Sequence, residues 1–238
     1  MRRRLGVWAL VCALALAGVA AELALLRHRP GKAPVAAEGV IAALGGFRSM
    51  AAEAVWFRAD RLQEEGRYVE LAQLASTLAF LEPHTPEVWG YAAWNLAYNI
   101  SVMMPTDEDR WRWVYAGMRL LRDEGLRLNP DDPMLSRELA WLFQLKIGGN
   151  IDSAAPLYRK KWREIVEDAA SRNAWGELGM DEARMRKIER IYGVKDWTDP
   201  IASVIYWAHF GVDGATGDTR AFLIEQIRQS RFMLNRSA

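Results

Sequence analysis

The sequence contains one cysteine, three histidines and almost no excess of either charge. A lone Cys12 can form neither an intrachain disulfide nor a cysteine-rich metal site. Its 31 Lys and Arg residues against 30 Asp and Glu residues give a net charge of +1. Nucleic-acid binding depends on a surplus of basic side chains facing phosphates, so we expect no nucleic-acid partner.

Strand patterns and catalytic motifs are also missing. Apolar residues recur at spacings of three and four, and no alternating segment of β-branched residues is present, which predicts helices and no strands. The chain has no Gly-rich phosphate loop, His-Glu-x-x-His helix, Gly-x-Ser-x-Gly elbow or calcium loop. His209 lies in an apolar stretch without a second catalytic group, so we interpret it as a packed residue. We therefore expect no enzyme activity, cofactor or metal.

One long apolar run is present, at the N-terminus. Residues 5–26 contain a single charge, Glu22, and follow three arginines. About 20 apolar residues are enough for a helix to cross a bilayer. Because the run continues past Ala21, we interpret residues 1–26 as an uncleaved, single-pass transmembrane anchor. The alternative is a secretory signal cleaved after Ala21. Either interpretation exports the body of the chain, and the arginines favour a cytoplasmic N-terminus.

Two segments share one pattern, in which an amphipathic stretch meets a proline, a short polar turn and a second proline. Pro83 and Pro86 frame the first turn, and Pro130 and Pro133 frame the second. Proline cannot continue a helix but suits its first position, so each pair marks the end of one helix and the start of the next. Repetition of helix, tight turn and helix is typical of an α-solenoid.

The spacing of apolar residues gives a domain organisation for the whole chain. After the anchor we expect a juxtamembrane linker over 27–44, helical repeats over 45–171 and a helical cap over 172–238. In the last helix, the apolar residues Phe222, Leu223, Ile227, Phe232 and Met233 should face inward. The predicted helices are 47–64, 67–82, 86–103, 107–128, 133–147, 151–171, 181–192, one from residue 200 through 210, and 218–233.

The first predicted hairpin has small and large residues at a regular spacing. They are Trp56, Ala59, Gly66, Tyr68, Leu71, Ala75, Leu78 and Pro83. Small residues let antiparallel helices approach, and large ones fill the groove to the next hairpin. With Gly45-Gly46-Phe47-Arg48 before it, the region resembles the divergent, membrane-anchored tetratricopeptide-repeat proteins of bacteria.

This resemblance implies an all-α, tetratricopeptide-like solenoid of antiparallel helical hairpins, preceded by the transmembrane helix. It also implies a place at the outer face of a bacterial inner membrane and a role as a docking scaffold for another protein. The alternative is a structural subunit that packs permanently against a membrane complex. An enzyme is the third alternative.

Tryptophans and asparagines supply the candidate partner-binding residues. Trp89 and Trp94 lie on one predicted helix, and Trp111 and Trp113 lie two positions apart on another. Neither pair can share one buried stripe of period 3.6, so part of this aromatic surface should face outward. Asn95 and Asn99 are four positions apart on one helix face, where they either hold an extended peptide or bridge helices. The candidate residues are Trp94, Asn95, Asn99, Trp111 and Trp113.

Overall fold

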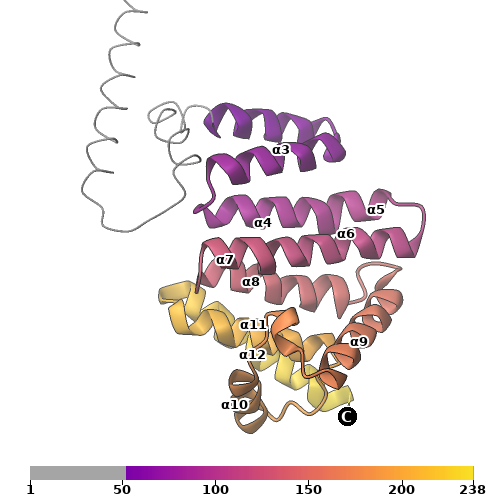
Figure 1. The fold of residues 1–238 in the computed structure, drawn as a ribbon, viewed down its shortest axis with the longest axis vertical. Coiled ribbons are helices and arrows are strands. Elements are labelled where there is room, and N and C mark those ends of the chain that lie inside the picture. The colour runs from indigo at the N-terminus through magenta and orange to yellow at the C-terminus, as the bar shows by residue number, and fades with distance from the viewer. Residues whose placement is uncertain (1–51, 238) are drawn as a thin grey trace, which may run out of the picture. The chain divides into compact units, whose positions relative to one another are not determined.

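The computed structural model describes residues 52–237 (Figure 1), and the chain forms two compact units, residues 1–64 and 65–238. The described part of the first unit is a helix over residues 52–64. The predicted anchor (1–26) and linker (27–44) lie outside the described residues. The division between the units falls inside the predicted repeat segment 45–171, and no division accompanies the predicted boundary at residue 172.

The described residues are all-α, as the apolar spacing predicts, and residues 52–237 contain no strand. No helix within this range is both long and apolar enough to span a bilayer. The elements of the second unit are α3 (Tyr68–Leu81), α4 (Pro86–Trp94), η1 (Asn95–Ile100), α5 (Ser101–Met103), α6 (Asp107–Arg119), η2 (Leu120–Gly125), α7 (Leu126–Leu128), α8 (Pro133–Trp141), η3 (Leu142–Ile147), α9 (Ala155–Ser171), η4 (Trp175–Leu178), α10 (Glu182–Tyr192), α11 (Pro200–Gly214) and α12 (Gly217–Ser237).

The helix starts follow from capping residues and prolines. Pro86, Pro133 and Pro200 each stand in the first turn of a helix, where the missing N–H group costs nothing. The Asp132 side chain accepts a hydrogen bond from the Leu135 N–H at 2.9 Å, which satisfies one of the free donors of α8. Because of these prolines and caps, α4, α8 and α11 begin where the proline spacing predicts.

Three helices contain a wider, π-helical turn in their C-terminal halves, at η1, η2 and η3. The α4–η1–α5, α6–η2–α7 and α8–η3 segments are therefore each one continuous helix, spanning 86–103, 107–128 and 133–147. In η3, for example, the Gly148 N–H bonds to the Phe143 carbonyl, five residues back, at 2.8 Å. Such a turn adds a residue to the helix and rotates the side chains that follow it relative to those before it.

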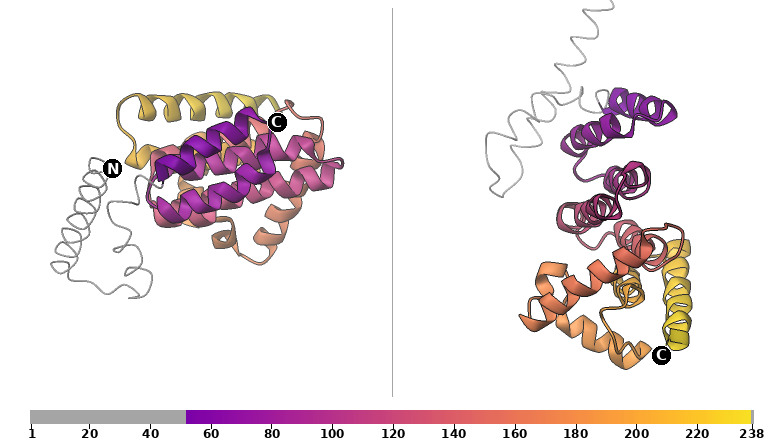
Figure 2. Two further views of the ribbon diagram at one scale, coloured as in Figure 1. Left: turned by 90° about the horizontal axis from the view of Figure 1, so that it is seen from above. Right: turned by 90° about the vertical axis from the view of Figure 1, so that its right-hand side faces the viewer.

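Helices of the second unit lie on two sides. Figure 2 (right) shows α4 and α8 on one side, called here the first-helix side, and α3 and α6 on the other, the second-helix side. Helix α12 crosses on the first-helix side, where it packs against α11 and α8. The Cβ of an alanine at Gly117 would lie 2.7 Å from the Ala93 carbonyl oxygen, so α6 and α4 approach closely at this glycine.

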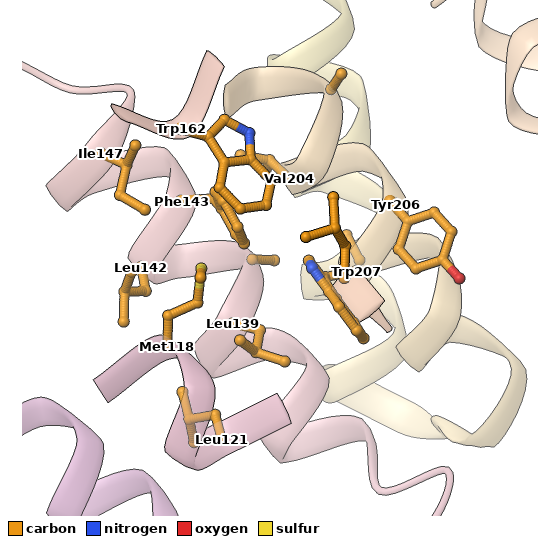
Figure 3. Packing of buried hydrophobic residues seen from close by; sticks show 14 of the residues in the cluster. Met118, Leu121, Leu139, Leu142, Phe143, Ile147, Trp162, Val204, Tyr206 and Trp207 are labelled. Atoms are coloured by element: carbon orange, nitrogen blue, oxygen red, sulfur yellow. The ribbon is translucent and has the colours of Figure 1, made fainter. Parts of the chain in front are cut away.

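The core of the second unit lies where α6, α8, η3, α9 and α11 meet. Phe143 and Trp162 form an edge-to-face pair with ring centroids 4.7 Å apart, and both are buried (Figure 3). Trp207 on α11 packs in the same cluster and is only 3% exposed. This large aromatic core fixes α8 and α11, the two helices on which α12 rests.

Candidate protein-interaction surface

Four aromatic side chains form a continuous row across three helices on the first-helix side. Trp94 stacks on Tyr98 with ring centroids 4.1 Å apart and meets Trp141 of α8 edge-on at 6.3 Å. Trp141 in turn lies 5.6 Å from Phe222 of α12. We call Tyr98, Trp94, Trp141 and Phe222 the aromatic strip. Trp94 is 37% exposed and Phe222 is 40% exposed, while Tyr98 and Trp141 are half-buried, so Trp94 and Phe222 are the most accessible rings of the strip.

The indole N–H of Trp94 is paired with a neighbouring carboxylate, whereas the Tyr98 hydroxyl is buried without a hydrogen-bond partner. The Trp94 indole donates to a Glu138 carboxylate oxygen at 2.7 Å, and Arg137 donates to the other oxygen at 2.8 Å. The Arg137 guanidinium also lies 5.9 Å from the centre of the Phe222 ring, within the range of a cation–π contact. Glu138 is buried and Arg137 balances its charge, so the strip is an aromatic surface with a neutral polar margin.

Tyr98 ties the strip to a buried ionic cluster. The Lys146 ammonium lies 5.2 Å from the centre of the Tyr98 ring and donates to Asp152 at 2.6 Å. The Tyr158 hydroxyl donates to the same Asp152 oxygen at 3.0 Å. Burial raises the pKa of the Tyr98 hydroxyl, and the nearby carboxylate of Glu138 adds to the shift. Tyr98 and Tyr158 therefore stay neutral at ordinary pH.

Burial of Asp152 by itself would raise the pKa of its carboxyl group. The hydrogen bonds from Lys146, the Ala154 N–H and Tyr158 outweigh that effect and lower the pKa below 3.8. Arg110 adds a second cation at 3.3 Å. Asp152 is thus ionised at neutral pH, and its negative charge balances the positive charge of the buried Lys146 beside the strip.

Asn95 lies beneath the strip and does not face a partner. It is only 2% exposed, and its side-chain amide donates to the Tyr68 carbonyl of α3 at 3.1 Å. Asn99 is partly buried and donates to the Asn95 side-chain oxygen at 3.1 Å. The sequence leaves two roles open for Asn95 and Asn99, and this geometry matches the bridge between helices. The placement of Asn95 on a partner-facing surface is therefore corrected, because its amide closes the contact between α4–η1 and α3.

The tryptophan pairs divide as their spacing predicts. Trp89 is buried and Trp94 is exposed on one helix, while Trp111 is buried and Trp113 is half-buried on the other. Trp111 packs into the interior against Tyr115 and Tyr158, with ring centroids 5.3 and 5.9 Å away. Its burial removes Trp111 from the accessible surface, so only Trp94 and Trp113 remain available to a partner among the candidate tryptophans.

Trp113 lines a separate hollow on the second-helix side. This second-helix groove has a volume of about 530 Å³ and lies between α3 and α6–η2, with α4–η1 as its floor. Alanines of α3 form much of one wall, and Trp113 and Leu120 form the other. Glu124 and Gln73 are its polar lining residues. The groove is apolar: small alanines form the α3 wall, and Trp89, Leu96, Trp113 and Leu120 supply its large side chains.

Sequence reasoning missed Trp141 and Phe222, which complete the strip. A signal for Trp141 exists, because Trp94 stands eight positions after Pro86 and Trp141 stands eight positions after Pro133. Equivalent places in two first helices therefore carry the same side chain. No comparable signal marks Phe222, whose position depends on how α12 packs. Its predicted inward orientation is wrong, as is that of Phe232, which is 62% exposed.

Comparisons with known proteins add no family or relative, since no family model, curated protein or solved structure matches the chain. Among residues 52–237, no group of three His, Cys, Asp or Glu side chains could hold a metal ion. The aromatic strip and the second-helix groove are two candidate surfaces for binding a partner.

Proposed function

We propose that this protein is a membrane-anchored, tetratricopeptide-like scaffold that docks another protein on its aromatic strip. The observation that carries the proposal is the row of Tyr98, Trp94, Trp141 and Phe222, which joins α4–η1, α8 and α12 into one surface. Tryptophan dominates the energetically important positions of protein interfaces. The strip also rests on a neutralised, tightly packed base, so little side-chain freedom remains to be lost on binding.

The solenoid and the anchor are parts of the same proposal. Helices α3, α4–α5, α6–α7 and α8 succeed one another through short turns, which supports a stack of hairpins. Residues 5–26 supply the apolar run for an anchor, and the arginines before it favour export of the body to the outer face of a bacterial inner membrane. A scaffold held there presents its strip to proteins at or near the membrane.

The test is partner capture by the tagged full chain, extracted from its native membranes in mild detergent. We expect Trp94→Ala to reduce the captured partner by about tenfold or more, because it removes the exposed centre of the strip. Ile191→Ala is the matched control, since Ile191 is an equally accessible apolar residue on α10, at 49% exposure. Equal capture by both variants would overturn the proposal.

The same extract separates the scaffold from the alternative of a permanently packed structural subunit. A docked partner should be substoichiometric and lost on dilution and repeated washing, whereas a subunit should co-purify in fixed ratio through the same washes. The neutral margin formed by Arg137 and Glu138 supports docking, because an obligate interface is usually more hydrophobic than this surface.

A further inference from the structure

We infer that His209 and Arg184 form an acid-sensitive latch, which holds α10 against α11 at neutral pH and releases it when the His209 ring gains a proton. The inference does not depend on the docking role proposed above. It follows from the bond between the two side chains, from the few other contacts that hold α10, and from the charges around the ring.

The bond between Arg184 and His209 requires a neutral imidazole. The Nη1 atom of Arg184 lies 3.1 Å from Nδ1 of His209. Because a guanidinium only donates hydrogen bonds, Nδ1 has to accept, and the neutral ring carries its proton on Nε2. A proton on Nδ1 would remove the acceptor and place an imidazolium against a guanidinium, two like charges at hydrogen-bond distance.

Helix α10 has little else to hold it. It is 11 residues long, and its buried residues are Met185 and Ile188. At its N-cap, the Asp181 N–H donates to the Tyr206 hydroxyl of α11 at 2.7 Å. A helix of this length is marginal in water on its own, so α10 depends on its contacts with the rest of the fold.

Arg184 supplies most of the polar contact between α10 and α11. Besides the ring nitrogen, its guanidinium donates to the His209 carbonyl at 3.4 Å and to Asp213 at 2.9 Å. It also lies 4.7 Å from the centre of the Phe210 ring, within the range of a cation–π contact. A change at the His209 ring therefore acts directly on the side chain that ties the two helices together.

The charges around His209 oppose its protonation while α10 is in place. Burial lowers the pKa of the ring, and the positive charges of Arg184 and Lys187 lower it further. Among the described residues, Asp213 is the carboxylate whose charge acts in the opposite direction. Asp213 already accepts from Arg184, so a third cation on the ring would share a single counter-ion.

The neighbouring helices add no acid to this end of α11. On α12, Arg228 and Arg231 line a hollow of about 230 Å³ together with Tyr192 of α10. The Tyr192 ring meets the His209 ring edge-on, with centroids 6.0 Å apart. Helix α8 contacts this end of α11 through the uncharged Ser136.

Acid therefore favours the released state. Once α10 has left, the His209 ring is in water and takes up a proton near its ordinary pKa of about 6.5. In the closed state the pKa lies below this value, so the released state binds the proton more tightly. The released population should grow as the pH falls below 6.5, by up to about tenfold per pH unit for one proton.

A nitroxide spin label on α10 tests the latch in the full chain, solubilised in mild detergent. Cys12→Ala removes the natural cysteine, and Ile191→Cys places the label at an α10 position that is 49% exposed. Met103→Cys on α5, at 51% exposure, gives the matched control label. Between pH 7.5 and 5, we expect the mobile component of the α10 spectrum to grow at least about threefold, and the α5 spectrum to stay the same.

Two further substitutions separate the latch from a general loosening in acid. His209→Gln keeps an acceptor for Arg184 without a titrating ring, so the α10 label should remain immobile. Lys187→Gln removes an exposed cation that opposes protonation, so the midpoint of the change should move to higher pH. An α10 label that stays immobile to pH 5, labels on α10 and α5 that loosen together, or a midpoint that ignores Lys187→Gln would overturn the inference.

Discussion

The two sides of the second unit hold their tryptophans in different ways. On the first-helix side Trp94 stacks on Tyr98 and meets Trp141 edge-on, and its indole N–H donates to Glu138. On the second-helix side Trp113 lines a groove of about 530 Å³ opposite a wall of alanines. The first surface is a row of aromatic rings next to a buried ion pair. The second is a hollow between helices.

This difference shows that the supporting residues define the site. Trp94 and Trp113 have similar sequence surroundings, since each shares its helix with a second, buried tryptophan. Only Trp94 is backed by a ring that contacts the buried Lys146. A side chain held in one orientation loses less entropy when a partner binds, and this favours the first-helix side for the docking role that we propose.

The largest expected effect comes from breaking the ionic support of the strip. Asp152→Ala removes the counter-ion of the buried Lys146, and we expect the free energy of unfolding to fall by about 3–5 kcal/mol. Urea unfolding of the full chain in mild detergent, followed by circular dichroism, measures the change. Asp168→Ala is the control, because Asp168 pairs with Arg172 at the exposed surface and its loss should leave the stability nearly unchanged. Equal losses in the two variants would show that the buried pair of Lys146 and Asp152 stabilises the fold no more than an exposed ion pair does.

Helix positions were largely predictable from the sequence, because prolines and capping residues act locally. The helices at 86–103, 107–128 and 133–147 have the predicted limits. The last predicted repeat helix begins at Ala155 instead of residue 151. There the Asp152 side chain accepts hydrogen bonds from Ala154 and Lys146 and holds residues 151–154 out of the helix.

The site was only partly predictable, because it depends on packing between distant elements. The division of each tryptophan pair into a buried and a more exposed member follows from helical periodicity, and it is confirmed. The burial of Asn95 does not follow, because its partner Tyr68 lies 27 positions away. The inward face of α12 was predicted in part: Leu223 and Ile227 are buried as expected, but Phe222 and Phe232 are exposed. The polar residues Gln226 and Ser230 are buried, which an apolar pattern does not predict. A sequence pattern with a period of 3.6 residues also does not predict the π-helical turns.

A smaller effect separates bridging from binding at Asn95. Asn95→Ala leaves the Tyr68 carbonyl without its side-chain donor, and we expect a loss of about 1–3 kcal/mol in the free energy of unfolding. Asn99→Ala removes a bond to a side chain that keeps its other partner, so it should cost less. Urea unfolding of both single variants and the double variant measures the difference. Unchanged stability of Asn95→Ala with lost partner capture would return Asn95 to the binding surface.

The smallest expected effect is a pH dependence of α11, the helix that carries α12. His209 is buried, and Arg184 donates to its Nδ1 at 3.1 Å. Burial lowers the pKa of His209 below 6.5, and the charges of Arg184 and Lys187 lower it further against the opposing effect of Asp213. The folded state therefore resists protonation more than the unfolded state does. Stability is complete above pH 6.5 and falls as the pH drops below this value, by at most about 1.4 kcal/mol per pH unit.

Substitution of single histidines tests whether this dependence belongs to His209. His209→Gln keeps an acceptor for Arg184 without a titrating ring, so its unfolding free energy should vary less between pH 7 and 5 than that of the unchanged protein. His84→Gln is the control, because His84 is exposed and contacts only the Leu128 carbonyl through its ring at 3.0 Å. Its pH profile should match the unchanged protein. If His209→Gln kept the full dependence, the acid sensitivity would arise elsewhere, and α11 would hold α12 equally well over this pH range.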